Sequence, residues 1–302
     1  MKLLLLGKNG QVGWELQRSL AVLGEVVALD RNSTTHRADL SDLDGLAATV
    51  RSLRPDVIVN AAAYTAVDKA QAEPDLTHRI NALAPEVLAE EAQRLGALLI
   101  HYSTDYVFDG SGNRPWKETD ATGPLSVYGA TKLEGERLIA AHCPRHLILR
   151  TSWVYSARGG NFIRTMLRLA QERETLTVID DQRGAPTSAE LLADVTAMAV
   201  RQLVGSVPNG RSLASVYHVA AAGETSWHGY ATHVLAQTRR IRPDFPMKAS
   251  EVSAITSDSF VTAARRPLNS RLDTAKLQAA FALTLPAWQH GVDRVLAEIL
   301  SF

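Results

Sequence analysis

Residues 3–20 read "LLLLGKNGQVGWELQRSL", in which an apolar run, a glycine turn and the start of an amphipathic helix follow one another directly. Glycine permits a tight turn, lets backbone N–H groups approach a pyrophosphate and allows close packing of a helix on a strand. The helix N-terminus then faces the phosphate charge. The spacing is G-x-x-G-x-x-G, and its strand–turn–helix context favours a dinucleotide-binding turn over a purely structural one. The expected cofactor contacts are Gly7, Gly10, Gln11, Val12 and Gly13.

The rest of the first half repeats this alternation of apolar strand-like runs and helical ones. We expect strands at residues 2–6, 25–30, 55–63, 97–104 and 146–155, and helices near 11–23, 42–53, 75–95 and 126–142. Such alternation predicts an α/β fold with a doubly wound parallel sheet of the Rossmann type and helices on both faces. Unbroken apolar strands such as "LLLL" suit a sheet that is covered on both sides.

The alternation loosens after residue 150, although helices at 161–173 and 188–203 stay clear. We therefore divide the chain into a dinucleotide-binding domain, residues 1–150, and a smaller C-terminal lobe, residues 151–302, that mainly binds substrate. The run "YHVAAAG" at 217–223 favours one more strand, by which the chain crosses back to the sheet. The segment 240–259 is rich in proline and polar residues, which indicates irregular structure.

The composition is that of a globular protein with balanced charge. Of 302 residues 46% are hydrophobic, and 32 Lys and Arg balance 32 Asp and Glu, so no overall field favours nucleic acid or an anionic membrane. The single cysteine, Cys143, excludes an internal disulfide and a Cys-based zinc site. No apolar run is long enough for a signal peptide or a membrane span, so we expect a cytoplasmic protein.

Acidic and small residues follow the next predicted strands, where the rest of a dinucleotide would lie. Asp30 ends the second strand, and its carboxylate can accept hydrogen bonds from ribose hydroxyls, which favours NADH. Its neighbour Arg31 can instead hold a 2′-phosphate, which favours NADPH, so both cofactors stay open. After a short third strand, "RADLSD" supplies residues to flank adenine, and "AAA" leaves room for the cofactor backbone. The positions concerned are Asp30, Arg31, Asp39, Leu40, Ala61, Ala62 and Ala63.

Two further stretches, "HYSTDYVFDG" at 101–110 and "SVYGATKLEGE" at 126–136, carry groups suited to proton transfer. The first follows a strand, so its hydroxyls lie at the sheet edge where open α/β sheets bind ligands. Tyr128 and Lys132 in the second are four residues apart and share a helical face. A free phenol has a pKa near 10. A nearby ammonium favours phenolate by about 1–3 units, so we expect Lys132 to lower the pKa of Tyr128 while Thr104 or Ser103 holds the substrate oxygen.

With these motifs in place the sequence resembles the extended short-chain dehydrogenase/reductases, most closely their members that act on dTDP-linked 4-keto-6-deoxyhexoses. The resemblance runs almost end to end, through "GKNGQVGWELQRSL", "RPDVIVNAAAYTAVDKA", "HYSTDYVFDG", "VYGATKLEGE", "RTSWVYS", "DQRGAPTSAELLAD" and "RPLNSRLDTAKL". It implies NADPH- or NADH-dependent reduction of dTDP-4-dehydro-L-rhamnose to dTDP-L-rhamnose. Hydride would pass to sugar C4 while Tyr128 protonates the oxygen, with Thr104 and Lys132 completing a catalytic triad.

The same resemblance implies further site residues. The cofactor set also takes in Tyr102, Tyr128 and Lys132, and the sugar-nucleotide site comprises Thr65, Val67, Thr104, Asp105, Tyr128 and Trp153. It further implies a homodimer that holds Mg²⁺ through Glu15, Glu190 and Glu298, although each of these also fits a solvated helix face. Two other functions stay open: a different sugar-nucleotide reductase or epimerase on this fold, and a non-catalytic, cofactor-binding regulatory subunit.

Overall fold

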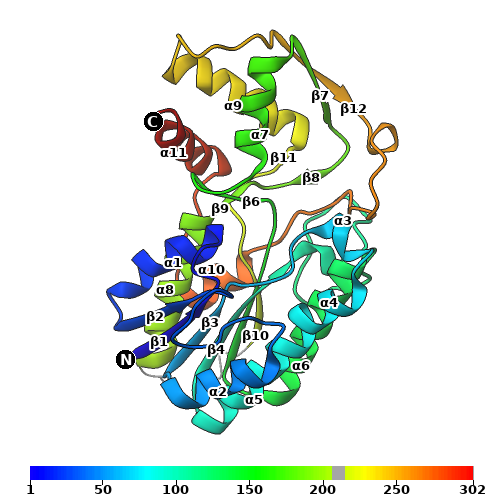
Figure 1. Cartoon of the computed structure of the whole chain (residues 1–302). Coiled ribbons are helices and arrows are strands. Elements are labelled where there is room, and N and C mark those ends of the chain that lie inside the picture. Colours follow the sequence, from blue (N-terminus) through cyan, green and yellow to red (C-terminus); the bar gives the residue numbers. More distant parts are fainter. Residues whose placement is uncertain (206–214, 302) are drawn as a thin grey trace.

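A computed structural model describes residues 1–205 and 215–301 of the chain. Its centre is a six-stranded sheet in the order β10-β5-β4-β3-β1-β2, and every neighbouring pair in it is parallel. The strands are β1 (Lys2–Leu6), β2 (Glu25–Leu29), β3 (Val57–Asn60), β4 (Leu98–Thr104), β5 (His146–Thr151) and β10 (Ser215–His218). The parallel sheet with helices on both faces, seen in Figure 1, confirms the predicted fold class.

Helices cover both faces of the sheet because its strands are apolar on both sides. In β1, Leu3 and Leu5 pack into one core and Leu4 and Leu6 into another, as alternate residues of a strand must. The first face carries α1 (Gln11–Ala21), α8 (Ala189–Gly205) and α10 (Ala275–Phe281). The second carries α2 (Leu43–Leu53), α5 (Ala84–Leu95) and α6 (Val127–His142).

A smaller lobe stands above the C-terminal ends of the sheet strands in Figure 1. Its own apolar core joins α7 (Phe162–Glu172), α9 (Trp227–Ile241) and α11 (Trp288–Leu300) to the parallel pair β7 (Thr175–Ile179) and β12 (Glu251–Ile255). Two short pairs lie between lobe and sheet: β6 (Val154–Tyr155) with β9 (Thr187–Ser188), and β8 (Arg183–Gly184) with β11 (Thr225–Ser226). Three elements after residue 150, α8, β10 and α10, pack in or on the main sheet, so the chain crosses back to it.

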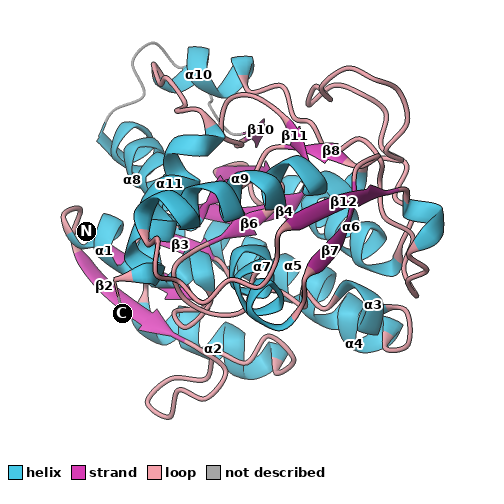
Figure 2. Ribbon diagram, turned by 90° about the horizontal axis from the view of Figure 1, so that it is seen from above, coloured by secondary structure: helices cyan, strands magenta, loops and turns pink. Residues whose placement is uncertain are grey.

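Three expectations about individual elements were wrong. The helix predicted at 75–95 is divided into α4 (Pro74–His78), a π-helical turn η1 (Arg79–Leu83) and α5, after a short α3 (Val67–Ala70). No strand forms at "RADLSD", which lies in the loop between β2 and α2. The segment 240–259 is only partly irregular, because β12 pairs with the distant β7 to complete the lobe (Figure 2). Short 3₁₀ turns lie at η2 (Asp105–Val107) and η4 (Ser257–Ser259).

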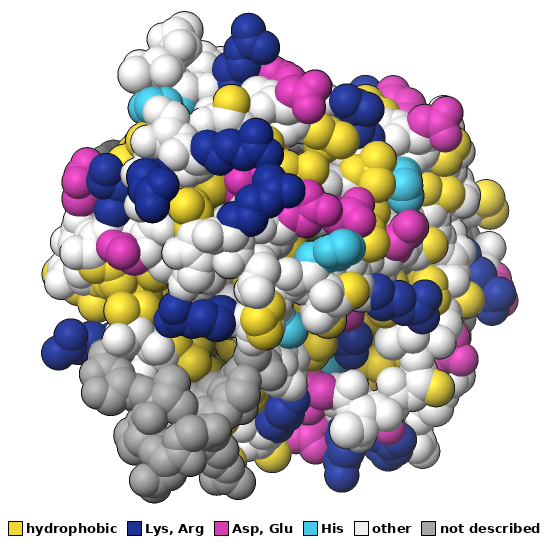
Figure 3. Space-filling view, turned by 90° about the horizontal axis from the view of Figure 1, so that it is seen from below, with side chains coloured by type: hydrophobic (Ala, Val, Ile, Leu, Met, Phe, Trp, Pro, Cys, Tyr) yellow, Lys and Arg dark blue, Asp and Glu magenta, His cyan; other side chains and the backbone are white. Residues whose placement is uncertain are grey.

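The surface opposite the lobe mixes both signs of charge. Figure 3 shows Lys and Arg interspersed with Asp and Glu and with apolar side chains over this face. Such mixing gives no extended field of one sign. No helix in the described part of the chain is long and apolar enough to cross a membrane.

Candidate active site

A cavity of about 870 Å³ opens at the C-terminal ends of the sheet strands, at the glycine turn. It brings together most of the residues that the sequence singled out. Those that line it are Gly7, Gly10, Gln11, Val12, Asp30, Arg31, Asp39, Leu40, Ala61, Ala62, Ala63, Thr65, Tyr102, Asp105, Tyr128, Lys132 and Trp153. Gly13, Val67 and Thr104 do not line it, although the Thr104 side chain interacts with that of Tyr128.

The glycine turn has the tight geometry that a dinucleotide requires. Gly7 has a φ of +90°, and a Cβ there would lie 2.9 Å from the Ala61 carbonyl carbon. A Cβ on Gly13 would lie 2.0 Å from the Gly7 oxygen, so this glycine serves the packing of α1 on β1 and not the cavity wall. Helix α1 begins without a side-chain cap, which leaves its first backbone N–H groups for a ligand. The residues present therefore fit a pyrophosphate.

At the far end of this cavity the Asp30 carboxylate is held by its neighbours. Oδ1 accepts hydrogen bonds from the Ser33 hydroxyl at 2.9 Å and the Asn32 N–H at 3.1 Å, and Oδ2 accepts one from the Asn9 amide. Arg31 lines the cavity beside it. A fixed carboxylate and a guanidinium therefore line the same cavity, which leaves both cofactor forms possible, as the sequence indicated.

Helix α6 delivers Tyr128 to the cavity from its first turn. Ser126 caps the helix by accepting the Gly129 N–H at 3.2 Å, and a Cβ on Gly129 would lie 2.2 Å from the Tyr106 oxygen, so only glycine lets α6 approach this closely. The Tyr128 ring packs edge-on to Tyr106 at 5.5 Å. Burial raises the pKa of Tyr128 to about 12, although its hydrogen bond with Thr104 acts in the opposite direction. This phenol is a protonated donor at neutral pH.

Lys132 lies one turn further along α6 and is 2% exposed. Its Nζ donates to the Tyr102 carbonyl oxygen at 2.6 Å and lies 3.0 Å from His101 Nε2. Burial lowers the pKa of Lys132 to about 8, with the Glu136 carboxylate acting in the opposite direction. The expectation that Lys132 lowers the pKa of Tyr128 was wrong for this structure, because burial raises that pKa and the partners of the Lys132 ammonium are on β4.

Glu136 on α6 and Arg150 on β5 form a buried ion pair near these groups. Glu136 and Arg150 are each 4% exposed, and the Ser103 hydroxyl donates to Glu136 Oε1 at 2.5 Å. Of the Ser103 and Thr104 hydroxyls, Thr104 is the one that interacts with the phenol, and it also donates to Asp105 Oδ1 at 3.1 Å. Asp105 beside it has one oxygen, Oδ2, without a hydrogen-bond partner in the described part of the chain, and burial raises the pKa of this carboxyl to about 7.

A second cavity of about 1190 Å³ adjoins the first on the lobe side. Trp153, which lines the first cavity and has a φ of +48°, stacks at 3.8 Å on Trp227, which lines the second. The sequence reasoning missed the basic side chains here, because they come from α7, its C-terminal end and the 260–268 loop and share no motif. They are Arg168, Arg173, Arg265 and Arg266. Arg168 is paired with Glu172 and Arg266 with Asp68, so Arg173 and Arg265 are the side chains of this set that suit an anionic group.

Comparisons with known proteins agree over the full length. The family model described as RmlD substrate binding domain matches residues 1–301. The dTDP-4-dehydrorhamnose reductase of Escherichia coli strain K12 is 54% identical over 301 residues, which cover 100% of this chain and 99% of that protein. The Burkholderia thailandensis enzyme of the same name is 46% identical over 100% of both chains. The chain belongs to the dTDP-4-dehydrorhamnose reductase family.

Solved structures support this placement. The dTDP-4-dehydrorhamnose reductase of Clostridium acetobutylicum has a TM-score of 0.89 at 32% identity, covering 100% of both chains. The Bacillus anthracis reductase, solved in complex with NADP, has a TM-score of 0.86 at 32% identity over 98% of this chain and 99% of that one. A UDP-glucose 4-epimerase from Thermus thermophilus, 21% identical with a TM-score of 0.78, shows the shared fold alone.

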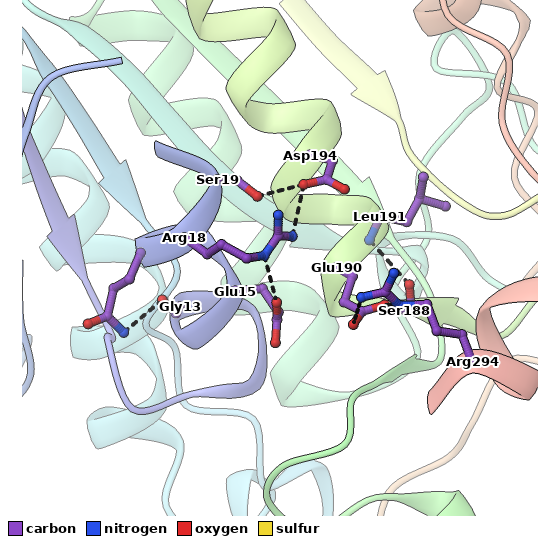
Figure 4. Close-up of polar contacts among 10 residues, drawn as sticks. Gly13, Glu15, Arg18, Ser19, Ser188, Glu190, Leu191, Asp194 and Arg294 are labelled. Atoms are coloured by element: carbon purple, nitrogen blue, oxygen red, sulfur yellow. Dashed lines mark hydrogen bonds and ion pairs between the residues drawn. The ribbon is translucent and has the colours of Figure 1, made fainter. Parts of the chain in front are cut away.

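The glutamates expected to bind Mg²⁺ in this reductase family lie near one another but do not form an ion site in one chain. Figure 4 shows Glu15 paired with Arg18 and Glu190 paired with Arg294. The N–O distances of these ion pairs are 3.5 Å and 3.0 Å. Burial raises the pKa of Glu15, and the nearby Glu190 raises it further. Among the described residues these carboxylates, with Glu298, do not converge on one point. A single chain therefore does not fit the ion.

Proposed function

We propose that this chain catalyses the NADPH- or NADH-dependent reduction of the C4 keto group of dTDP-4-dehydro-L-rhamnose, which gives dTDP-L-rhamnose. The observation that carries the proposal is that Tyr128, which interacts with Thr104, and Lys132 line one cavity with the glycine turn. We infer the substrate from the name of the Escherichia coli and Burkholderia thailandensis reductases, which are 54% and 46% identical to this chain. The NADP complex of the Bacillus anthracis reductase supports the cofactor.

In the proposed reaction Tyr128 donates its phenolic proton to the sugar O4. When bound, the reduced nicotinamide supplies the hydride for C4. The raised pKa of Tyr128 keeps the phenol protonated until negative charge develops on O4, and the Thr104 hydrogen bond fixes its direction. Lys132, which faces the same cavity, supplies positive charge that favours loss of this proton.

The remaining parts of the substrate match the walls of the two cavities. Arg173 and Arg265 of the second cavity suit the diphosphate, because guanidinium groups bind phosphate oxygens in a bidentate manner, whereas Arg168 and Arg266 are paired with Glu172 and Asp68. The free Oδ2 of Asp105 suits a sugar hydroxyl. Trp153 stands between these regions, and its positive φ is the kind of backbone strain that accompanies functional sites.

The test is loss of absorbance at the nicotinamide band with the dTDP-linked 4-keto-6-deoxy-L-hexose and each cofactor in turn. We expect stoichiometric oxidation of the cofactor by the wild-type chain and a loss of about 10²–10⁴-fold in kcat for Tyr128→Phe, with cofactor binding retained. The matched control Tyr217→Phe removes a phenol from β10 and should keep turnover. Turnover of substrate without net oxidation of cofactor would favour an epimerase, and persistent inactivity would favour a regulatory subunit.

We also propose that the chain works as a homodimer and that any Mg²⁺ binds between two copies. The support is the group of Glu15, Glu190 and Glu298 on α1, α8 and α11, where one chain alone does not form an ion site. Light scattering with Mg²⁺ and with a chelator should give twice the chain mass in the first case. A monomer in both conditions would contradict the dimer, and a dimer unaffected by the chelator would contradict the role of the ion.

A further inference from the structure

A line of buried polar side chains runs across the sheet beneath Lys132 and is not explained by the reaction described above. Asn60 at the end of β3 and His101 in β4 are each 1% exposed. They are direct partners in the β3–β4 ladder, so both side chains leave the sheet on the same face. Asn60 Nδ2 lies 3.1 Å from His101 Nδ1, and His101 Nε2 lies 3.0 Å from Lys132 Nζ.

The backbone decides which way these hydrogen bonds run. The Ala62 N–H donates to Asn60 Oδ1 at 3.1 Å, so the amide of Asn60 must point its NH₂ group at the imidazole. His101 Nδ1 is then an acceptor, and in a neutral imidazole the single proton resides on Nε2. Burial and the adjacent Lys132 hold the pKa of His101 well below its ordinary value, so the ring is neutral.

This tautomer places an N–H group against the lysine. Nε2–H can donate to a neutral amine, but it opposes an ammonium, which has no lone pair to accept it. The other neighbours of Nζ act differently. The Tyr102 carbonyl oxygen accepts from it, and Glu136, whose charge is shared with Arg150 on β5, favours the ammonium.

Two further titratable side chains lie on the cavity side of Lys132. Tyr128 on the same helix and Asp105 on η2 line the cavity that Lys132 faces. Of the two groups within hydrogen-bond distance of Nζ, the Tyr102 carbonyl accepts and His101 presents a donor.

We propose that Asn60 and His101 are positioning residues of this enzyme: Asn60 fixes the imidazole tautomer, and the imidazole holds Lys132 Nζ at the cavity and favours its neutral form. The consequence for catalysis rests on the proposed reductase function. Deprotonation of Lys132 removes the positive charge near Tyr128, so the tautomer of His101 sets the pH at which activity declines on the alkaline side.

Asn60→Asp tests the proposal with almost no change in shape. A carboxylate accepts from Nδ1–H, which moves the imidazole proton to Nδ1 and turns Nε2 into an acceptor for the ammonium. We expect the alkaline limb of kcat/KM to move up by about one pH unit, with little change in the KM for cofactor. An unchanged limb would overturn the proposal.

The His101→Phe background separates this effect from the direct influence of a new carboxylate. There, Asn60→Asp should give no further shift of the limb, because the imidazole that connects the two residues is gone. An equal shift in that background would mean that the charge acts through space and would overturn the proposal. Should His101→Phe fail to fold, His101→Gln, whose amide oxygen can accept from Nζ, should by itself raise the limb.

A spectroscopic measurement tests the tautomer without any turnover. In ¹⁵N NMR of histidine-labelled enzyme, the resonance pair assigned to His101 should show an unprotonated Nδ1 and a protonated Nε2, and Asn60→Asp should reverse them. A protonated Nδ1 in the wild-type chain would contradict the proposal whatever the activity. The predicted tautomer in a chain that does not reduce the sugar nucleotide would contradict the proposed function instead.

Discussion

The carboxylate of Glu136 and the guanidinium of Arg150 meet inside the protein through two hydrogen bonds, Nε to Oε1 at 2.8 Å and Nη2 to Oε2 at 2.6 Å. Each side chain is 4% exposed, so neither charge is compensated by water. The pair links α6, which carries Tyr128 and Lys132, to strand β5 of the sheet. It therefore fixes the helix on which the chemistry depends.

Removing one partner of this pair should destabilise the fold strongly. Arg150→Met leaves the Glu136 charge buried without a partner, and we expect the free energy of unfolding to fall by about 3–5 kcal/mol. Urea denaturation followed by circular dichroism measures this. Arg37→Met breaks a pair whose side chains are 77% and 38% exposed and should have little effect. Equal losses for the two variants would show that burial is not the reason for the effect.

Gly13→Ala should damage cofactor binding although Gly13 does not line the cavity. The new methyl group would lie 2.0 Å from the Gly7 oxygen, and this contact is with backbone that has no room to move. We expect α1 to shift, NADPH affinity to fall by about tenfold or more, and stability to fall by about 1–3 kcal/mol. Fluorescence titration with NADPH measures the affinity.

Gly160→Ala is the matched control for this change, since nothing lies within 4 Å of its added Cβ. It should bind NADPH as the wild-type chain does. Wild-type affinity in Gly13→Ala would mean that the glycine turn tolerates a displaced helix, which contradicts the role given to its geometry.

The sequence predicted well those features that depend on residues close together in the chain. The strand–turn–helix of residues 3–20 and the pairing of Tyr128 with Lys132 follow from glycine chemistry and helical spacing, and the structure brings these residues to one cavity. The buried carboxyl of Asp105 was placed at the sheet edge because it directly follows β4.

What the sequence did not predict depends on contacts between distant residues. β12 forms because it pairs with β7, more than seventy residues earlier, so its own polar composition did not reveal it. The arginines of the second cavity come from separate elements with no shared spacing. The pKa of Tyr128 depends on how completely the helix is buried, which residue types and spacing do not fix.

Lys132→Met should stabilise the protein at neutral pH while it removes activity. Burial lowers the lysine pKa to about 8 in the folded chain, against about 10.4 when unfolded. The unfolded chain therefore binds more protons between these values, and the wild-type fold carries a penalty below pH 8 that disappears as pH rises to about 10. Methionine fills the volume without charge, so we expect a gain of about 2 kcal/mol at pH 7 that shrinks toward pH 10.

Urea denaturation of both chains between pH 7 and pH 10 measures this difference. The control Lys117→Met replaces an exposed lysine and should give a difference that does not change with pH. If Lys132→Met were destabilising by the same amount at every pH, the lysine would be contributing through packing and hydrogen bonds alone, and its burial would carry no charge penalty.

Asp30 and Arg31 should affect the choice of cofactor in opposite directions. The Asp30 carboxylate is fixed by Asn9, Asn32 and Ser33, where it can accept from an adenosine ribose and repels a 2′-phosphate. In Asp30→Ala we expect the ratio of kcat/KM for NADPH to that for NADH to rise by about tenfold, and in Arg31→Ala we expect it to fall by a similar factor. Initial rates with each cofactor at saturating sugar nucleotide give both ratios. A shift in the same direction in both variants would show that the two side chains do not compete for one ribose position.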